Sequence, residues 1–118
     1  MPKTSIIYYI SPSGNNPVKD FIDQFEFRQK SKIFRLFATI ENYGLISILP
    51  HIRKLTGTPL WEIRILGQDN IRFIYLTKTK DSIVVLHGFN KKTNKTPQKE
   101  LDIALERFKS LNNISYTI

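Results

Sequence analysis

The strongest constraint on the fold is a change in the spacing of apolar residues near the middle of the chain. Before Gly44, apolar side chains recur at helical spacing. After Pro59, they alternate with polar ones or form short continuous runs, in the segments PLWEIRIL, NIRFIYLT and SIVVLHGF. A short GQDN turn joins the first two segments, which is typical of a hairpin. We therefore expect helices in the first half of the chain and an antiparallel meander in the second.

Two apolar stripes predict two helices before the meander. The stripes have i, i+3, i+4, i+7 spacing and consist of Val18, Phe21, Ile22 and Phe25, then Ile33, Leu36, Phe37 and Ile40. Asn16 suits the N-cap of the first helix and Pro17 its first turn, while Gly44 ends the second. Only the charged stretch RQKSK separates the stripes, so one bent helix is the alternative.

The remaining elements complete a small α+β fold. We expect a first strand over residues 5–10, ending before Pro12 and Gly14, and a short strand near residues 52–55. The continuous apolar run SIVVLHGF favours a central strand. The last helix is predicted with Thr96 as its cap and Pro97 at its first position, and its stripe consists of Leu101, Ala104, Leu105, Phe108 and Leu111. One domain spanning residues 1–118 follows, in which the meander packs against an N-terminal helix pair and a C-terminal helix.

Composition narrows the classes of function. The chain has no cysteine, which excludes disulfides, thiolate catalysis and cysteine-bound zinc. No apolar run approaches the length of a membrane span, and the N-terminal apolar stretch is too short for a signal peptide. We therefore expect a cytoplasmic protein without a membrane partner.

Positive charge is concentrated in the second half of the chain. The formal net charge is +8, and residues 53–99 hold ten Lys/Arg against three Asp/Glu. Such a field favours a polyanionic partner. The basic segment lacks the pattern of an amphipathic helix, so nucleic acid is favoured over a membrane surface.

The candidate site residues are cations. Neither His51 nor His87 has an acidic residue at ligand spacing, so we expect no metal site and no cofactor. The phosphate-binding candidates are Arg53, Lys54, Arg64, Arg72, Lys91, Lys92 and Lys95. Clustered cations stabilise a phosphoryl transition state, and a lysine whose pKa is lowered acts as a base on an RNA 2′-hydroxyl.

Each candidate also has a structural interpretation. Arg64 shares a strand face with Glu62, where solvated charges are usual, and Arg72 has Glu62 or a helix acid as a partner. The three lysines after the last strand are interpretable as an ordinary solvated loop. His87 suits a partly buried, hydrogen-bonded histidine as well as a general acid, and Trp61 suits the core as well as stacking on a base.

The motifs resemble a known toxin family. The segments KLTGTPLWEIRI, IRFIYL and VVLHGFNKKTNKTPQKELDIALERF, between Lys54 and Arg107, are similar to the HigB-like, phage-associated branch of the RelE toxin superfamily. One departure is Ile71, where that family often has tyrosine before the arginine. The resemblance implies the toxin of a type II toxin–antitoxin pair, a ribosome-dependent mRNA endoribonuclease that cleaves without metal in the A site. It also implies a helix-turn-helix, HigA-like antitoxin as partner, besides the ribosome and mRNA.

The resemblance also implies roles for single residues. Arg64 and Arg72 are expected at the scissile phosphate, Lys92 in proton transfer, and His87 as a weaker catalytic candidate. Arg53, Lys54, Lys91 and Lys95 are expected to hold flanking RNA or ribosomal RNA. Two alternatives stay open, a nucleic-acid-binding module without catalysis and a module whose basic face meets only an acidic antitoxin segment.

Overall fold

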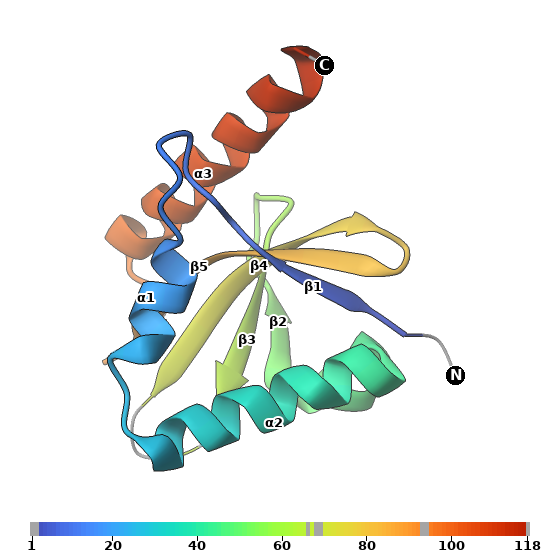
Figure 1. Cartoon of the computed structure of the whole chain (residues 1–118), viewed down its shortest axis with the longest axis vertical. Helices are drawn as coiled ribbons and strands as arrows, with labels where there is room; N and C mark the ends of the chain where they lie inside the picture. Colours follow the sequence, from blue (N-terminus) through green and yellow to red (C-terminus); the bar gives the residue numbers. More distant parts are fainter. Residues whose placement is uncertain (1–2, 66, 68–69, 93–94, 118) are drawn as a thin grey trace.

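The computed structural model describes residues 3–65, 67, 70–92 and 95–117 (Figure 1). In this part the elements are, in chain order, β1 Ser5–Tyr8, α1 Pro17–Asp23, α2 Phe27–Tyr43, the 3-10 helix η1 Leu45–His51, β2 Ile52–Lys54, β3 Trp61–Ile65, β4 Ile71–Thr79, β5 Ser82–Asn90 and α3 Gln98–Thr117. The predicted α+β class is confirmed, with helices flanking a mixed sheet. The first strand ends two positions before the predicted end at residue 10.

The sheet has the strand order β1-β5-β4-β3-β2. Strands β3 to β5 pair antiparallel in succession, as predicted for the meander. The short strand expected near residues 52–55 is β2, and it pairs antiparallel with β3. Strand β1 pairs with β5 in parallel, with Ser5 opposite Ser82. β5 therefore has a neighbour on each side, which agrees with the central position that its apolar run predicted.

The N-terminal helices are two, not one bent helix. Asn16 caps α1, because its side-chain oxygen accepts a hydrogen bond from the Lys19 amide at 3.1 Å. The break falls at residues 24–26, so the charged stretch predicted to separate the helices lies inside α2. Gly44 ends α2 with a φ of 80°, a left-handed conformation that glycine adopts without steric cost.

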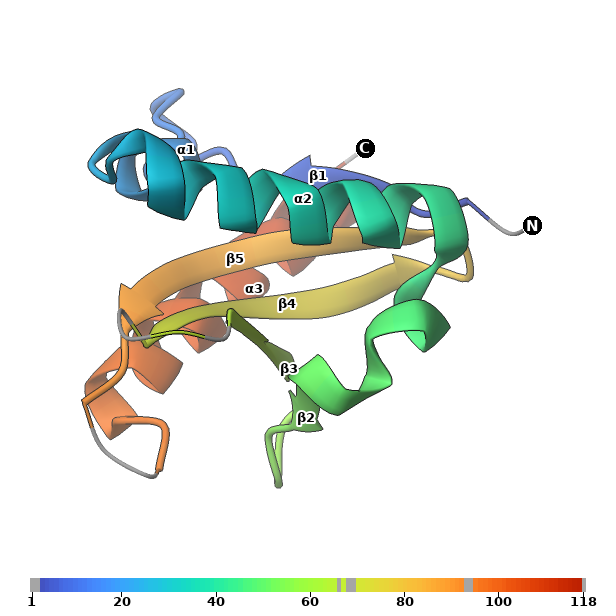
Figure 2. The same cartoon turned by 90° about the horizontal axis from the view of Figure 1, so that it is seen from below.

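The helices divide between the two faces of the sheet (Figure 2). α1 and α2 cover one face, where Ile33 and Phe37 pack against Ile63, Phe73 and the other residues of the larger core. α3 covers the opposite face, where Ala104 and the partly buried apolar residues of its stripe pack against Ile74, Leu86 and Phe89. These partners belong to β4 and β5. On the same face, β2 and β3 lie beside the part of the sheet that α3 covers.

The start of α3 differs from its prediction. The Pro97 carbonyl accepts hydrogen bonds from the Glu100 and Leu101 amides at 3.0 and 3.1 Å, so Pro97 occupies the cap position and the helix begins at Gln98. The prediction that Thr96 caps α3 is wrong, because its hydroxyl bonds to other side chains. Those bonds belong to the site described next.

Candidate functional site

A row of charged residues crosses the face of the sheet that carries α3. The pairing sets Arg53 opposite Glu62 and Arg64 opposite Arg72. Residues that lie opposite each other, or two apart along a strand, share a face. The partner of Arg72 on β5 is Phe89, which belongs to the core under α3. Strands β2, β3 and β4 thus gather these cations on one surface.

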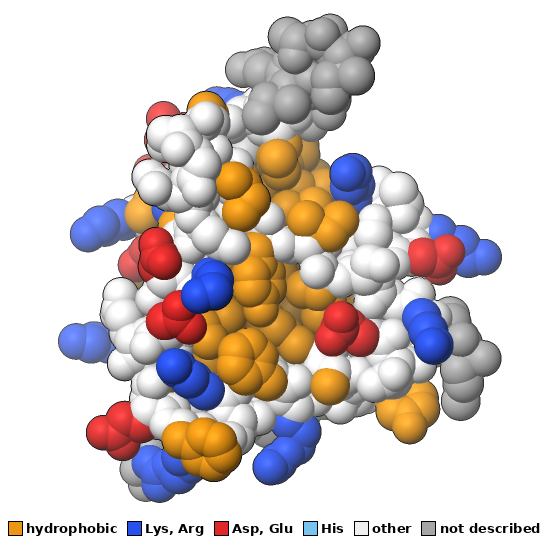
Figure 3. All heavy atoms as spheres, in the orientation of Figure 1, with side chains coloured by type: hydrophobic (Ala, Val, Ile, Leu, Met, Phe, Trp, Pro, Cys, Tyr) orange, Lys and Arg blue, Asp and Glu red, His pale blue; other side chains and the backbone are white. Residues whose placement is uncertain are grey.

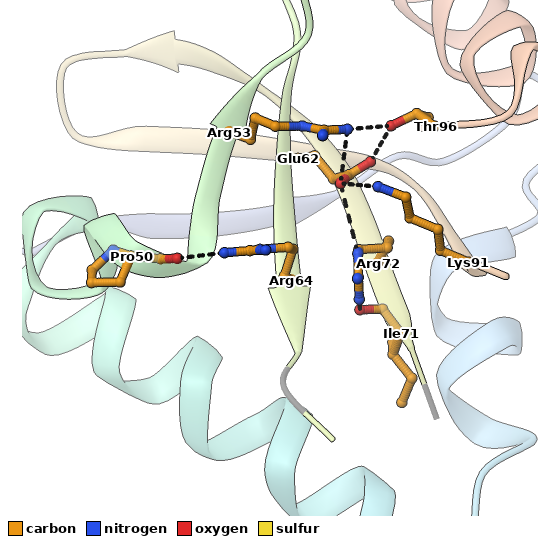
Figure 4. Close-up of polar contacts among 8 residues, drawn as sticks. All are labelled: Pro50, Arg53, Glu62, Arg64, Ile71, Arg72, Lys91 and Thr96. Atoms are coloured by element: carbon orange, nitrogen blue, oxygen red, sulfur yellow. Dashed lines mark hydrogen bonds and ion pairs between the residues drawn. The ribbon is translucent and has the colours of Figure 1, made fainter. Parts of the chain in front are cut away.

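Glu62 is the centre of this cluster (Figure 4). Its Oε1 lies 3.6 Å from Arg53 Nη2, 3.7 Å from Arg72 Nε and 3.6 Å from Lys91 Nζ. Its Oε2 accepts a 2.5 Å hydrogen bond from the Thr96 hydroxyl, which itself accepts one from Arg53 Nη2 at 3.0 Å. We call Arg53, Glu62, Arg72, Lys91 and Thr96 the Glu62 cluster.

Glu62 is fully buried, with 0% of its surface exposed, so the expectation that it is a solvated strand residue is wrong. Lys91 and Thr96, which lie between β5 and α3, both contact its carboxylate. An ionised group in this position requires neighbouring cations, because desolvation of a lone buried charge is costly. The predicted pairing of Arg72 with Glu62 is confirmed.

The cluster keeps a positive excess, since three cations surround one carboxylate. Burial lowers the pKa of Lys91 from its usual value; Glu62 opposes that shift, and Arg53 and Arg72 add to it. Burial likewise lowers the pKa of Arg72, against the influence of Glu62. In the described part of the chain, Arg72 Nε and Arg64 Nε have no hydrogen-bond partner. Both nitrogens are buried, so these two N–H groups remain unsatisfied inside the fold.

Of two other candidates, Arg64 shares the sheet face of this cluster, whereas Lys54 pairs with Trp61 and lies on the opposite face. Arg64 points away from Glu62, and its Nη2 donates to the Pro50 carbonyl at 3.0 Å (Figure 4). The exposed Lys54 donates to the Thr58 carbonyl, and its ammonium lies 5.7 Å from the centre of the Trp61 ring. Trp61 is partly buried and packs against the core of the α1 and α2 face, as its core interpretation predicted.

The lysines after β5 do not form one uniform loop. Lys91 is buried, with 5% of its surface exposed, and its amide extends the strand pairing by donating to the Asn70 carbonyl at 2.8 Å. The solvated-loop interpretation is therefore wrong for Lys91. Lys92 and Lys95 are exposed. Lys91 belongs to the Glu62 cluster.

His87 has partners at both ring nitrogens. Nε2 lies 2.8 Å from Glu100 Oε1 and Nδ1 lies 3.2 Å from Arg107 Nη1, both on α3. Because a guanidinium only donates, Nδ1 accepts and Nε2 carries the proton. Burial lowers the pKa of His87, and the bond to Glu100 opposes that shift. These contacts favour the partly buried, hydrogen-bonded histidine, and the catalytic role stays a prediction.

Two members of the cluster were not predicted as site residues. Glu62 was taken for a solvated charge and Thr96 for a helix cap. The available signal was the alternation of WEIR, which places Glu62 and Arg64 on one face. Glu62 needs cationic neighbours because it is buried. The local sequence pattern does not show that burial.

Another cavity lies away from these charges. It has about 410 Å³ and lies between β1 and α2, lined by Ile6, Tyr8, Ile10, Asn16, Phe34, Phe37 and Glu41. Figure 3 shows hydrophobic side chains gathered on the face seen with β1, α1 and α2 in front. In the described residues, no helix has the length and apolar content to cross a membrane.

The α+β fold, with helices flanking a mixed sheet, is compatible with a RelE-like domain. Residues 20–109 match the model of a family described as phage derived protein Gp49-like (DUF891). This match spans most of the 118 residues, so the chain belongs to the Gp49-like family. The family is part of the RelE/ParE-like toxin superfamily, and its relatives include the RelE-type endoribonucleases. No curated protein matches the chain.

Proposed function

We propose that the protein is a HigB-like toxin that cleaves mRNA in the ribosomal A site. The observation that carries the proposal is the positive excess of the Glu62 cluster, on the face that also presents Arg64. Guanidinium groups gathered on one face suit the charge that develops on phosphoryl oxygens. Membership of the Gp49-like family supports a toxin of this superfamily.

The proposed reaction is attack of an RNA 2′-oxygen on the adjacent phosphorus. A base removes the 2′-hydroxyl proton, the new bond closes a 2′,3′-cyclic phosphate, and the bond to the 5′-oxygen breaks as that oxygen takes up a proton. Arg64 and Arg72 are assigned to the phosphoryl oxygens. No metal ion and no organic cofactor takes part in the proposed reaction.

Proton transfer is assigned to the neighbouring lysines. Lys91 is assigned as the base, since burial lowers its pKa and so raises the neutral fraction of its amine. Exposed Lys92 is assigned to return a proton to the 5′-oxygen. Arg53, Lys54 and Lys95 are assigned to flanking RNA. His87 is assigned to hold α3 against β5 through Glu100 and Arg107.

Positioning of the RNA is the reason to involve the ribosome. The cluster supplies charge and one perturbed lysine, and an in-line attack geometry must come from whatever holds the mRNA. The proposed partner that blocks the toxin is a helix-turn-helix antitoxin of the HigA type. Family membership supports an antitoxin partner in general terms.

In vitro translation of an end-labelled mRNA tests the proposal. Purified protein is added with and without ribosomes, beside an Arg72→Ala/Lys92→Ala double variant. A Lys78→Ala/Lys80→Ala variant is the control, since it removes the same charge from exposed positions at the β4–β5 turn. We expect cuts that require ribosomes, persist in the control and fall by at least about 100-fold in the double variant. Intact mRNA with folded protein contradicts the nuclease function and leaves a non-catalytic binding module.

A further inference from the structure

A second basic site lies on the other face of the sheet, between α2, η1 and the end of β3. It is a cavity of about 330 Å³ lined by Lys32, Arg35, Leu36, Thr39, His51 and Ile65. Figure 2 shows α2 above the sheet and η1 leading from its end to β2. Ile65 follows Arg64, and His51 follows the Pro50 carbonyl that Arg64 binds. The cavity therefore adjoins the proposed active site across the sheet.

The chemistry of the lining is that of an anion site with an apolar floor. Lys32, Arg35 and His51 supply nitrogen donors, and Leu36 and Ile65 supply hydrophobic surface. None of the lining residues is acidic. The Lys32 ammonium reaches the β3–β4 connection, since a Cβ on Gly67 would lie 2.8 Å from its Nζ. Two cations from one helix and an imidazole from η1 thus surround one opening.

The cations of this cavity have no structural partner in the part of the chain that the structure describes. Neither Lys32 nor Arg35 takes part in an ion pair there. On α2, Lys32 lies four residues after Arg28 and three residues before Arg35. Like charges at these spacings destabilise a helix. His51 Nδ1 is buried without a hydrogen-bond partner. These groups therefore destabilise the fold on their own, and a bound anion would compensate by pairing with them.

We propose that this cavity binds a nucleotide unit of RNA, with the phosphate on Lys32, Arg35 and His51 and the sugar or base on Leu36 and Ile65. The volume lies within the usual range of small-molecule sites, about 300–1,000 Å³. A free anion would need no apolar floor. The identity of the ligand as RNA rests on the proposed function. The cavity gives the protein a second hold on RNA, on the opposite face from the Glu62 cluster.

The first test is an NMR titration of the ¹⁵N-labelled full chain with uridine 5′-monophosphate, beside uridine and inorganic phosphate. We expect amide shifts around Lys32, Arg35 and His51 with the mononucleotide, weaker ones with phosphate, and none with uridine at equal concentration. These shifts should vanish in a Lys32→Ala/Arg35→Ala variant and persist in the Lys78→Ala/Lys80→Ala control. Equal shifts in both variants, or shifts confined to the Glu62 cluster, overturn the proposal.

The second test is binding of a labelled single-stranded RNA, measured by fluorescence anisotropy over a range of salt concentrations. Loss of Lys32 and Arg35 should weaken binding by roughly tenfold at low salt. It should also reduce the slope of log K against log salt by about 1.4, from about 0.7 for each phosphate contact. The charge-matched control should lose less of both. A variant that binds like the control overturns the proposal.

These tests separate the site from the nuclease function. Mononucleotide binding at Lys32 and Arg35, in a protein that leaves ribosomal mRNA intact, contradicts only the proposed function. Ribosome-dependent cleavage by a protein whose Lys32→Ala/Arg35→Ala variant cleaves and binds RNA as the parent does contradicts only the second site.

Discussion

The hydroxyl of Thr96 donates a 2.5 Å hydrogen bond to Oε2 of Glu62, which lies 34 positions earlier in the chain. This bond joins the segment before α3 to β3. Arg53 on β2 donates to the same hydroxyl, so three separate segments meet at one buried carboxylate. Glu62 therefore helps to fix the backbone of Lys91 and Lys92 relative to the arginines, although Glu62 itself takes no part in the proposed chemistry.

Replacing Glu62 by glutamine should destabilise the fold strongly. The amide keeps the shape of the side chain but leaves Arg53, Arg72 and Lys91 without a counter-charge. Breaking a buried ion pair in this way costs about 3–5 kcal/mol. Urea unfolding followed by circular dichroism measures the change. Glu106→Gln on the exposed face of α3 is the control and should stay within about 0.5 kcal/mol of the parent. Equal stability of the two variants would contradict the central place of Glu62.

Thr96 offers a finer test of the same cluster, because valine keeps its shape and serine keeps its hydroxyl. Thr96→Val leaves Glu62 Oε2 without its donor, and an unsatisfied buried acceptor costs about 1–3 kcal/mol. Thr96→Ser should recover most of that loss. The free energy of unfolding of the two variants decides the matter. A serine variant as unstable as the valine variant would mean that the methyl group, not the hydroxyl, is what the fold requires.

His87 should make stability depend on pH. Burial lowers its pKa in the folded state below the ordinary value of 6.5, against the influence of Glu100. The unfolded chain therefore binds more protons as the pH falls through this region. The stabilising contribution of neutral His87 is complete above pH 6.5 and is lost as the pH falls toward the folded-state pKa, with a slope of at most about 1.4 kcal/mol per pH unit.

The measurement is the free energy of unfolding between about pH 7.5 and 5.5, for the parent and for His87→Gln. Glutamine can donate to Glu100 and does not titrate, so the slope should flatten in the variant. Glu100 and Arg107 are the charged groups that face the ring, and both remain in the variant. Parallel curves would show that another group sets the pH dependence.

The periodicity of apolar residues predicted the helices and the meander because these patterns are local. The parallel pairing of β1 with β5 joins residues about 77 positions apart, such as Ser5 and Ser82, and nothing in either segment records it. The break between α1 and α2 was misplaced for a related reason. The charges of RQKSK suggested a break between the helices, yet α2 accommodates all three, with Arg28 exposed and Lys30 and Lys32 partly buried.

The site was predicted in part. Arg64 and Arg72 lie on adjacent strands of the predicted meander, which brings them to one face, and the pairing of β2 with β3 adds Arg53. The burial of Glu62 and Lys91 depends on how the segment after β5 folds back over β3, which alternation within a strand does not report. Two residues placed in the site by sequence, Lys92 and Lys95, lie exposed beside it, and His87 lies under α3.

Gly88 should not tolerate a side chain. A Cβ at this position would lie 2.5 Å from Phe21 Cδ2 and 2.8 Å from Phe73 Cε1. Gly88→Ala therefore overpacks the core between α1 and β5, with a cost of about 1–3 kcal/mol. Phe21→Leu should partly relieve the clash, so the double variant should be more stable than the sum of the single losses predicts. Simple additivity in urea unfolding would contradict a direct contact between Phe21 and position 88.

The proposed base can be identified from the pH dependence of cleavage. If Lys91 takes the 2′-hydroxyl proton, the single-turnover rate on mRNA-programmed ribosomes should rise with pH and level off once the pH exceeds the lowered pKa of Lys91. Lys91→Ala should remove this rise and cost at least about 100-fold near neutral pH. Lys92→Ala should lower the rate while keeping the rise. Lys78→Ala serves as the control for charge alone. Because Glu62 raises the pKa of Lys91, a folded Glu62→Gln protein should show the rise at lower pH. A Lys91→Ala profile parallel to that of the parent would exclude Lys91 and return the role to Lys92.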